Sequence, residues 1–279
     1  MRLRVVVTVD VERDYPNALE DRYLGITEGL PTLLDVFDEF EIRGDFFVSK
    51  DIADLFGQMI KNLGARGHFV GNHGAQHGYL CEMGFENQLR DIRESTQALS
   101  EVLSRPVMFR APQFGADGKT VLALEDLGYR VDSSVLPGRS VKRGVFGKTL
   151  DFTNAPREVY HPSESDIAKE GHSSIVEIPL TENPFKRGTP IGMGYLNSEG
   201  HETVMDACKA HRGRYVTFLI HPWECIDILE PYPSLPKYLG RECSSDTSSL
   251  RRLLEELKGL GDFTNLMDIA DEYIGGGSK

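Results

Sequence analysis

The sequence predicts an α/β fold built on a largely parallel sheet. Short apolar runs alternate with segments of helical period along most of the 279 residues. The first run, Leu3 to Val9, is rich in β-branched residues and is typical of a buried strand. Leu30, Leu33, Leu34 and Phe37 follow with the i, i+3, i+4, i+7 spacing of an amphipathic helix. From this alternation alone, the sheet can be open or closed into a barrel.

The remaining elements are expected to continue the same alternation. Apolar runs predict further strands near residues 46–48, 68–70, 107–109, 130–131, 175–180 and 215–220. Apolar residues at helical spacing predict helices near residues 52–63, 89–103, 121–127, 203–211 and 250–257. Asp246 or Thr247 is expected to cap the last of these helices. The stretch from about 137 to 170, rich in Gly, Pro and charge, is predicted to be the least regular.

Composition excludes several classes of protein. No run approaches the roughly 18 apolar residues of a membrane span. The net charge of -12, from 43 acidic and 31 basic residues, argues against a binder of nucleic acid. The apolar run that starts at Val5 meets Asp10 too soon for a signal peptide, and the four cysteines lack metal-site spacing. We therefore expect a cytoplasmic globular protein with free thiols, with oligomers possible, and a flexible tail at 275–279.

Chemically capable side chains recur where the predicted strands end. In parallel α/β sheets, ligands bind at the carboxyl ends of the strands. Seven residues of the chain follow expected strands in this way: Asp10, Glu12, His73, His77, Arg110, Asp132 and His221. Scattered surface charges would not be expected to choose these positions repeatedly, so they are our candidate site residues.

Four of these residues have the donor types of a metal site. His73 and His77 are four residues apart, and on one helical turn both rings would point to one side. Asp10 and Glu12 lie two apart and so share one side of a strand. Two histidines, one carboxylate and an open position describe both a hydrolytic zinc site and the facial triad of iron oxygenases. The carboxylate left over can serve as a general base.

Motifs along the chain resemble those of the polysaccharide deacetylases, also called the NodB-homology or carbohydrate esterase 4 group. The run Gly67-His68-Phe69-Val70-Gly71-Asn72-His73, with His77 beyond it, is similar to the family's histidine motif. The family's later motifs are resembled, in the same order, by Phe109-Arg110-Ala111-Pro112, Asp132-Ser133-Ser134 and Leu219-Ile220-His221. The resemblance implies a distorted (β/α) barrel of about seven parallel strands, related to the TIM barrel. It also implies one catalytic domain over residues 1–274.

The resemblance also implies roles around the metal. Glu12, His73 and His77 would hold one divalent ion, with Zn²⁺ favoured and Co²⁺, Ni²⁺ or Mn²⁺ as alternatives. Asp10 would be the general base, and Arg110 would hold and orient it. An amide carbonyl needs a Lewis acid, a base for water and an acid for its poor leaving group, so the set matches the chemistry.

Further roles concern the leaving group and the substrate. His221 would be the general acid that protonates the departing amine, and Asp132 would orient or tune it. The residues expected to contact the substrate are Gln113, whose backbone N–H is the candidate oxyanion donor, and Phe114, Leu219 and Trp223.

The chain also departs from the family pattern. Val11 separates two carboxylates that are adjacent in the usual motif, and the segment from Arg110 to Gly115 is one residue longer before its glycine. Gly74 stands where a serine usually follows the first histidine, and Leu136 stands where a tryptophan is usual. These differences predict an altered sugar-facing surface around a conserved type of metal chemistry.

The function predicted from these observations is metal-dependent hydrolysis of an N-acyl group, most readily the N-acetyl group of an amino sugar. A cytoplasmic chain would meet small or lipid-linked N-acylated sugars. One alternative is hydrolysis of a cyclic imide or ureide at the same site. A non-catalytic carbohydrate-binding relative is another, although binding alone needs neither Asp10 nor His221. An iron oxygenase is a third, but its site usually lies on an antiparallel barrel.

Overall fold

Eight parallel strands form the sheet of this protein, seen in a computed structural model that describes residues 2–16, 18–142, 149–211 and 213–276. Seven of them follow the order β10-β5-β4-β3-β2-β1-β11, and the eighth, β12, pairs with β1. The strands are β1 (Leu3–Val11), β2 (Asp45–Val48), β3 (Phe69–Asn72), β4 (Met108–Phe109), β5 (Val131–Asp132), β10 (Val176–Glu177), β11 (Tyr215–Ile220) and β12 (Gly261–Thr264).

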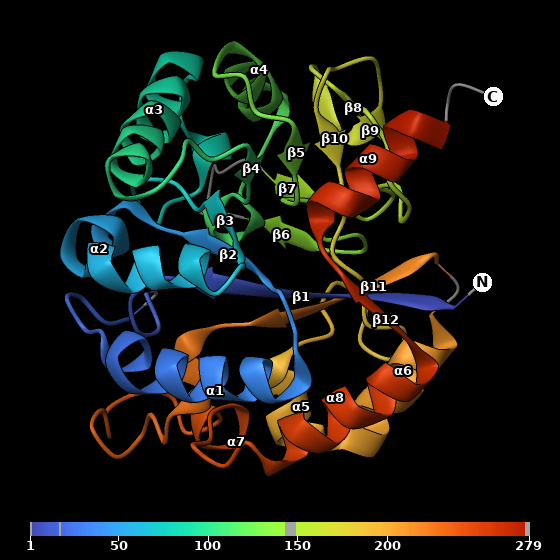
Figure 1. Cartoon of the computed structure of the whole chain (residues 1–279). Helices are drawn as coiled ribbons and strands as arrows, with labels where there is room; N and C mark the ends of the chain where they lie inside the picture. Colours follow the sequence, from blue (N-terminus) through green and yellow to red (C-terminus); the bar gives the residue numbers. More distant parts are fainter. Residues whose placement is uncertain (1, 17, 143–148, 212, 277–279) are drawn as a thin grey trace.

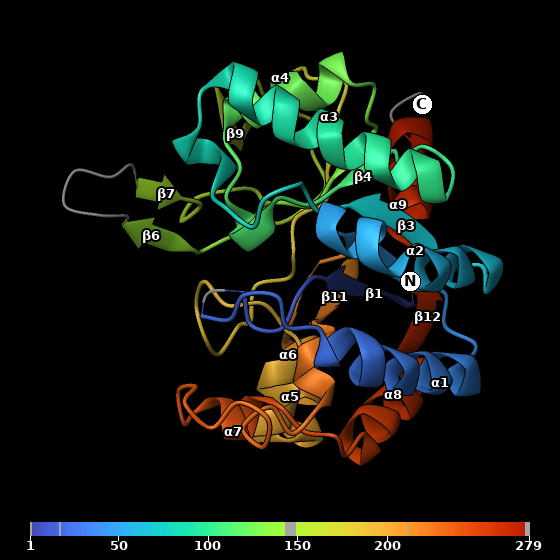
Figure 2. The same ribbon diagram turned by 90° about the vertical axis from the view of Figure 1, so that its left-hand side faces the viewer.

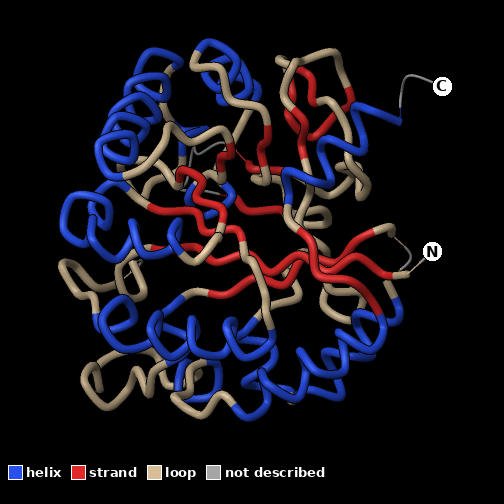
Figure 3. Tube along the Cα trace, in the orientation of Figure 1, coloured by secondary structure: helices blue, strands red, loops and turns tan. Residues whose placement is uncertain are grey.

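The sheet curls but stays open. Its order starts at β10 and ends at β11, and within the described ranges no strand pairing joins those two. Strand β1 lies near the middle of the molecule, paired with β11 on one side and with β2 on the other (Figures 1 and 3). The prediction of a distorted α/β barrel with about seven parallel strands is thus confirmed, in the form of a half-barrel.

Helices cover the sheet in two groups. In two views at right angles, α2 to α4 lie on one side of β1, and α1 with α5 to α8 on the other (Figures 1 and 2). The helices are α1 (Leu30–Phe40), α2 (Lys50–Ala65), α3 (Phe85–Val102), α4 (Gly118–Asp126), α5 (Met193–Glu199), α6 (His201–Ala210), α7 (Leu239–Glu242), α8 (Ser248–Leu260) and α9 (Leu266–Gly276). A π-helix, η1 (Gly25–Gly29), leads into α1, and three 3₁₀ helices are η2 (Leu80–Glu82), η3 (Pro112–Phe114) and η4 (Pro222–Cys225).

The predicted amphipathic helices are all present. The stripe from Leu30 to Phe37 is buried in α1, which begins with a proline in its first turn and ends at Glu41 in the left-handed conformation. Thr247 stands at the N-cap of helix α8 without a side-chain capping hydrogen bond, and the Asp246 carboxylate accepts a hydrogen bond from Ser248 N, so of the two predicted residues Asp246 supplies the bond. The sequence prediction did not include α5, α7, α9 or β12.

Alternation along β1 decides which side chains reach the interior of the curl. Val5, Val7, Val9 and Val11 pack into the core that contains α1 and α8. Val6 packs on the opposite face, against the aromatic and aliphatic residues of β2, β4 and β5. The even-numbered positions that follow, including Asp10 and Glu12, continue that inner face.

The segment predicted to be least regular contains two small antiparallel sheets. Strand β6 (Ser140–Lys142) pairs with β7 (Thr149–Asp151), and β8 (Pro162–Ser163) pairs with β9 (Asp166–Glu170). In Figure 2 the β6–β7 pair projects from the body of the molecule at the left. At the other end of the chain, α9 continues to Gly276, and the rest of the predicted tail, 277–279, lies outside the described residues. A search of the described helices finds none with the length and apolarity needed to cross a bilayer.

Candidate active site

Neighbouring strands deliver the predicted residues to one edge of the sheet. Asp10 is the last residue but one of β1, and Glu12 directly follows that strand. His73 follows β3, Arg110 follows β4, and His221 follows β11. Because β4, β3, β2, β1 and β11 are consecutive in the sheet and all parallel, their carboxyl ends meet. Residues that are distant in the sequence are brought together in this way.

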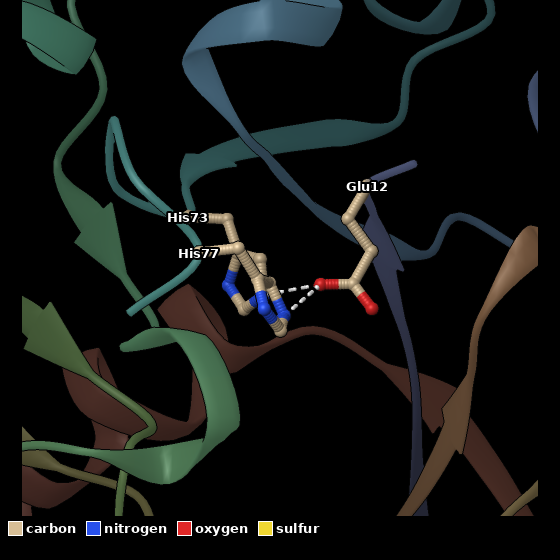
Figure 4. Close-up of side chains that lie close together, drawn as sticks. All are labelled: Glu12, His73 and His77. Atoms are coloured by element: carbon tan, nitrogen blue, oxygen red, sulfur yellow. Dashed lines mark ion pairs between the residues drawn. The ribbon is translucent and has the colours of Figure 1, made fainter. Parts of the chain in front are cut away.

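Glu12, His73 and His77 form a cluster of metal-ligand type. Their ligand atoms all lie within 4.8 Å of one another. The Oε2 atom of Glu12 is 2.7 Å from His77 Nε2 and 3.4 Å from His73 Nε2, and Figure 4 shows the carboxylate directed at both rings. Burial raises the pKa of Glu12, but His77 and His73 outweigh this and hold it well below its usual value. An ionised carboxylate with two imidazoles is a donor set that fits a divalent ion.

A loop, and not a helical turn, brings the two histidines together. Gly74 has φ +79, in the left-handed region that favours glycine, and its N–H donates to Asn72 Oδ1. The N–H groups of Ala75 and Gln76 donate to the Asp91 carboxylate at 2.8 and 3.0 Å. The helical turn considered for this segment is therefore wrong, although both rings still face Glu12.

The backbone of the neighbouring strand orients His73. Its Nδ1 lies 2.9 Å from the carbonyl oxygen of Arg110, an atom that can only accept, so Nδ1 carries the hydrogen and Nε2 faces Glu12. Burial lowers the pKa of His73, but Asp10 and Glu12 raise it overall. On the other ring, the Gln113 carboxamide nitrogen donates to the backbone oxygen of His77 and lies 3.5 Å from its Nδ1.

Asp10 is held from one side and free on the other. Arg110, which is fully buried, donates from Nη1 to Asp10 Oδ1 at 2.8 Å and to Thr8 Oγ1 at 3.0 Å. The other Asp10 oxygen, Oδ2, lies 4.0 Å from Nε2 of His73 and 4.0 Å from Nε2 of His221. This arrangement leaves one carboxylate oxygen directed into the site.

His221 lies across the site from the two histidines of the cluster. Its Nε2 is 3.9 Å from Glu12 Oε1, and its ring stacks on Trp223 with 4.8 Å between centroids and 24° between planes. Its Nδ1 lies 3.2 Å from Glu224 Oε2. Burial alone would lower the pKa of His221, but Glu224, Glu12 and Asp10 together raise it to about 9.

Asp132 has a different neighbour from the one expected. It lies opposite Glu177 in the register of β5 and β10, and both carboxyl groups are fully buried. Ser134 donates a hydrogen bond to Asp132 Oδ1. Burial together with the adjacent carboxyl raises the pKa of Glu177 well above its usual value, and burial raises that of Asp132 to about 6. The carboxylate beside His221 is that of Glu224, so the expectation that Asp132 orients His221 is corrected.

The predicted substrate contacts are placed less uniformly. A cavity of about 400 Å³ opens at the cluster, and its lining residues are Glu12, Arg13, Ser49, Asp51, His73, Ala75, Gln76, His77 and Gly78. Among the described residues that line it, none of the four predicted substrate contacts occurs. Gln113 touches His77 and Trp223 stacks on His221, so both adjoin the site. Phe114 and Leu219 belong to a hydrophobic core cluster.

The structure adds residues that the sequence prediction lacked. Thr8 and Ser133 accept hydrogen bonds from Arg110, Ser134 accepts one from the backbone N–H of Ala111, and Glu224 contacts the candidate acid. Ser133 and Ser134 belong to the motif quoted for Asp132, although no role was predicted for them. Glu224 also has a signal in the sequence, because an acidic residue three positions after a helix N-cap often bonds back to it. His221 is the N-cap of η4, and Glu224 is its third residue.

Comparisons with known proteins point to one family. Residues 6–131 match the family model described as polysaccharide deacetylase. A peptidoglycan-N-acetylglucosamine deacetylase of Bacillus cereus is 24% identical over 88 residues, which make up 32% of this chain and 32% of that protein. A peptidoglycan deacetylase-like protein, FGM2, of Gibberella zeae is 25% identical over 231 residues, covering 73% of this chain and 67% of that protein.

Solved structures share the fold. A crystal structure from Mycobacterium smegmatis, assigned to the polysaccharide deacetylases, has a TM-score of 0.68 at 21% identity and covers 100% of this chain and 92% of that one. The Puue allantoinase has a TM-score of 0.65 at 15% identity, with 98% of this chain and 90% of that chain covered. Residues 6–131 thus match the polysaccharide deacetylase model, and the chain as a whole shares the fold of the solved structures it resembles.

Proposed function

We propose that the protein is a metal-dependent hydrolase that removes an N-acyl group, in particular an N-acetyl group, from an amino sugar. One observation carries this proposal. The free oxygen of Asp10 and Nε2 of His221 lie 4.0 Å apart beside the Glu12-His73-His77 cluster. A base and an acid at that separation can serve the two proton transfers of amide hydrolysis at one carbon.

Glu12, His73 and His77 would hold the divalent ion, since two imidazole nitrogens and one carboxylate oxygen suit Zn²⁺ with a position left open. When bound, the ion supplies a Lewis acid that polarises the amide carbonyl and acidifies water. A non-catalytic sugar-binding protein of this fold would need neither Asp10 nor His221, and both residues here face the cluster.

The chain's own residues would carry the protons. Asp10 takes the proton from the attacking water while Arg110 fixes its other oxygen. The backbone N–H of Gln113 is our candidate donor to the oxygen that becomes negative. His221 then gives a proton to the nitrogen as the C–N bond breaks, so the products are a carboxylate and a free amine.

Names of relatives support a sugar substrate. The Bacillus cereus relative is named for N-acetylglucosamine within peptidoglycan, but the match covers only 32% of that protein. We propose a small or lipid-linked N-acylated sugar, handled by one catalytic domain over residues 1–274. Support for a cytoplasmic setting comes from the four cysteines, which are buried and free of disulfide bonds.

Hydrolysis of a cyclic ureide is the second candidate. The observation that favours it is the likeness of fold to a protein named allantoinase, at a TM-score of 0.65. The chain also has Leu136, buried, where the family resemblance implies a sugar-facing tryptophan. The same base, acid and ion could open a ring C–N bond.

A substrate screen separates these functions. The zinc-loaded protein is given free, nucleotide-linked and lipid-linked N-acetyl sugars, and a set of cyclic ureides, and carboxylate formation is measured with and without a chelator. Chelator-sensitive acetate release from a sugar supports the proposal. Turnover confined to the ureides replaces it with the second candidate, and no turnover of either set contradicts both.

Two variants test the assigned roles. His73→Ala/His77→Ala is expected to lose the bound ion, which metal analysis should find at about one per chain in the parent protein.

Asp10→Asn is expected to keep the ion and lose turnover by at least about 100-fold, because it removes only the base. Retained turnover in Asp10→Asn would show that another group takes the proton.

A further inference from the structure

The carboxylate of Glu224 is bound at both of its oxygens. Its Oε2 accepts a hydrogen bond from the backbone N–H of His221 at 2.7 Å and lies 3.2 Å from His221 Nδ1. Its Oε1 accepts from the backbone N–H of Gly194 at 3.0 Å. The residue is only 8% exposed. A carboxylate fixed in this way cannot rotate away from the imidazole without breaking several bonds.

These contacts decide which edge of the imidazole faces the site. Glu224 Oε2 already accepts a hydrogen bond from the backbone N–H of His221, so it acts as an acceptor here and His221 Nδ1 carries a hydrogen toward it. The opposite nitrogen, Nε2, then lies 4.0 Å from Asp10 and 3.9 Å from Glu12. The indole of Trp223 covers one ring face, which limits tilting.

We propose that Glu224 is the positioning residue of His221, taking the place that the family resemblance implied for Asp132. The inference rests on the proposed function only in calling His221 the acid; the orientation itself does not depend on any substrate. Glu224 comes from η4, three residues after His221, whereas Asp132 lies at the end of β5 beside Glu177.

Helix α5 supports this carboxylate from behind. Gly194 lies in its first turn, and a Cβ atom there would come within 2.8 Å of Glu224 Oε1. Asn197 of the same helix donates from Nδ2 to the backbone oxygens of Glu224 and Glu242 at 3.1 and 2.8 Å. Position 194 therefore has room for glycine but not for a residue with a Cβ atom. A methyl group there would push on Glu224 while leaving the chemistry of Glu224 and His221 unchanged.

The first test needs no substrate. Imidazole ¹⁵N shifts of His221, assigned through their loss in His221→Gln, report which ring nitrogen carries the hydrogen. We expect the hydrogen-bonded Nδ1–H signal in the parent protein. It should be lost in Glu224→Ala and perturbed in Gly194→Ala, and it should be unchanged in Glu242→Gln, a neighbouring carboxylate used as the matched control. An unchanged His221 spectrum in Glu224→Ala would overturn the proposal whatever the enzyme's substrate, and its loss in the Glu242 control would do the same.

The second test uses the leaving group. Glu224→Ala should lower kcat on an N-acetyl amide by about 10- to 100-fold, with KM and bound metal nearly unchanged. A 4-nitrophenyl acetyl ester, whose leaving group departs without a proton, should lose less than about threefold. Glu224→Gln, which keeps a carbonyl acceptor for His221, should recover part of the amide activity. Equal losses on amide and ester, or a loss of bound metal, would show a general structural role and contradict the proposal. If the parent protein hydrolyses neither compound, the proposed function fails, and the ¹⁵N result still decides the role of Glu224.

Discussion

At the scale of single residues, one guanidinium joins much of the candidate site. Arg110 donates to Asp10 and Thr8 on β1, and its Nε and Nη2 donate to the backbone and hydroxyl oxygens of Ser133. Its own carbonyl oxygen accepts from His73. The guanidinium also lies 4.3 Å above the Phe47 ring. These contacts require a planar group whose N–H donors point in fixed directions, as in the guanidinium of arginine. The flexible ammonium group of lysine would not replace it.

Arg110→Met should therefore separate orientation of the base from metal binding. It leaves Asp10 buried without its partner, so we expect the free energy of unfolding to fall by about 3–5 kcal/mol. Turnover of Arg110→Met should fall by about 100-fold, and the turnover of Arg110→Lys should lie between that of the parent protein and that of Arg110→Met. Bound metal should stay, because the backbone oxygen that orients His73 is present in every variant. Urea unfolding, metal analysis and kcat measure the three effects, and an Arg110→Met protein with full kcat would refute the role assigned to Arg110.

The sequence identified residues of this site by type and place, but not all of their partners. Asp10, Glu12, His73, Arg110 and His221 were recognisable because each stands at a strand end with a capable side chain. The pairing of His221 with Glu224 was not predicted. It depends on the turn of η4 and on the close approach of α5, neither of which the pattern of apolar residues reports.

At the scale of elements, strong periodicity was predictable and short or locally stabilised elements were not. The run of six apolar and β-branched residues at Tyr215–Ile220 is found as β11 with the predicted bounds. Helix α5 has seven residues and begins directly after Gly192, so its pattern is too short to recognise. The loop at Gly74 replaces a helical turn because Asn72 and Asp91 supply the hydrogen bonds that a helix would have made internally.

Packing between η1 and η4 gives a prediction at this scale. Gly29 has ordinary helical angles, yet a Cβ atom there would lie 2.1 Å from the Pro222 carbonyl oxygen. Gly29→Ala should therefore destabilise the protein by about 1–3 kcal/mol through overpacking, and should lower turnover by displacing η4 and with it His221.

Gly259→Ala is the matched control for that change. Gly259 lies in α8 with no atom within 4 Å of an added Cβ, so alanine should be neutral or stabilising by up to about 1 kcal/mol. Urea midpoints and kcat of the two variants make the comparison. Equal stability of the two, or full activity in Gly29→Ala, would mean that η4 does not depend on this contact.

At the scale of the whole molecule, the half-barrel encloses carboxyl groups that make no ion pair in the part of the chain that is described. Asp45, at the start of β2, accepts a hydrogen bond from the backbone N–H of Leu266 and so joins the sheet to α9. Burial raises the pKa of Asp45 to about 8, although the bond from Leu266 opposes this. Asp132 and Glu177 form a second buried group with raised pKa values. In each case the folded protein binds a proton that the unfolded chain releases at lower pH.

The sign of the resulting pH dependence follows from that difference. An unfolded aspartate titrates near pH 4. The stabilisation from protonated Asp45 is thus complete below about pH 4 and is lost as the pH rises through about 8. Asp45→Asn keeps an oxygen for Leu266 N–H and removes the titration. The stability of Asp45→Asn relative to the parent should therefore rise across this window, by at most about 1.4 kcal/mol per pH unit.

Urea unfolding of both proteins between pH 5 and pH 8 measures this difference. Asp262→Asn, at an exposed position of β12, is the control and should show a difference from the parent that varies little with pH. A constant gap between Asp45→Asn and the parent over the whole range would mean that Asp45 is already ionised in the folded state. In that case, the join between β2 and α9 would contain a buried charge, and Asp45 would not make the folded protein lose stability as the pH rises, contrary to the dependence expected here.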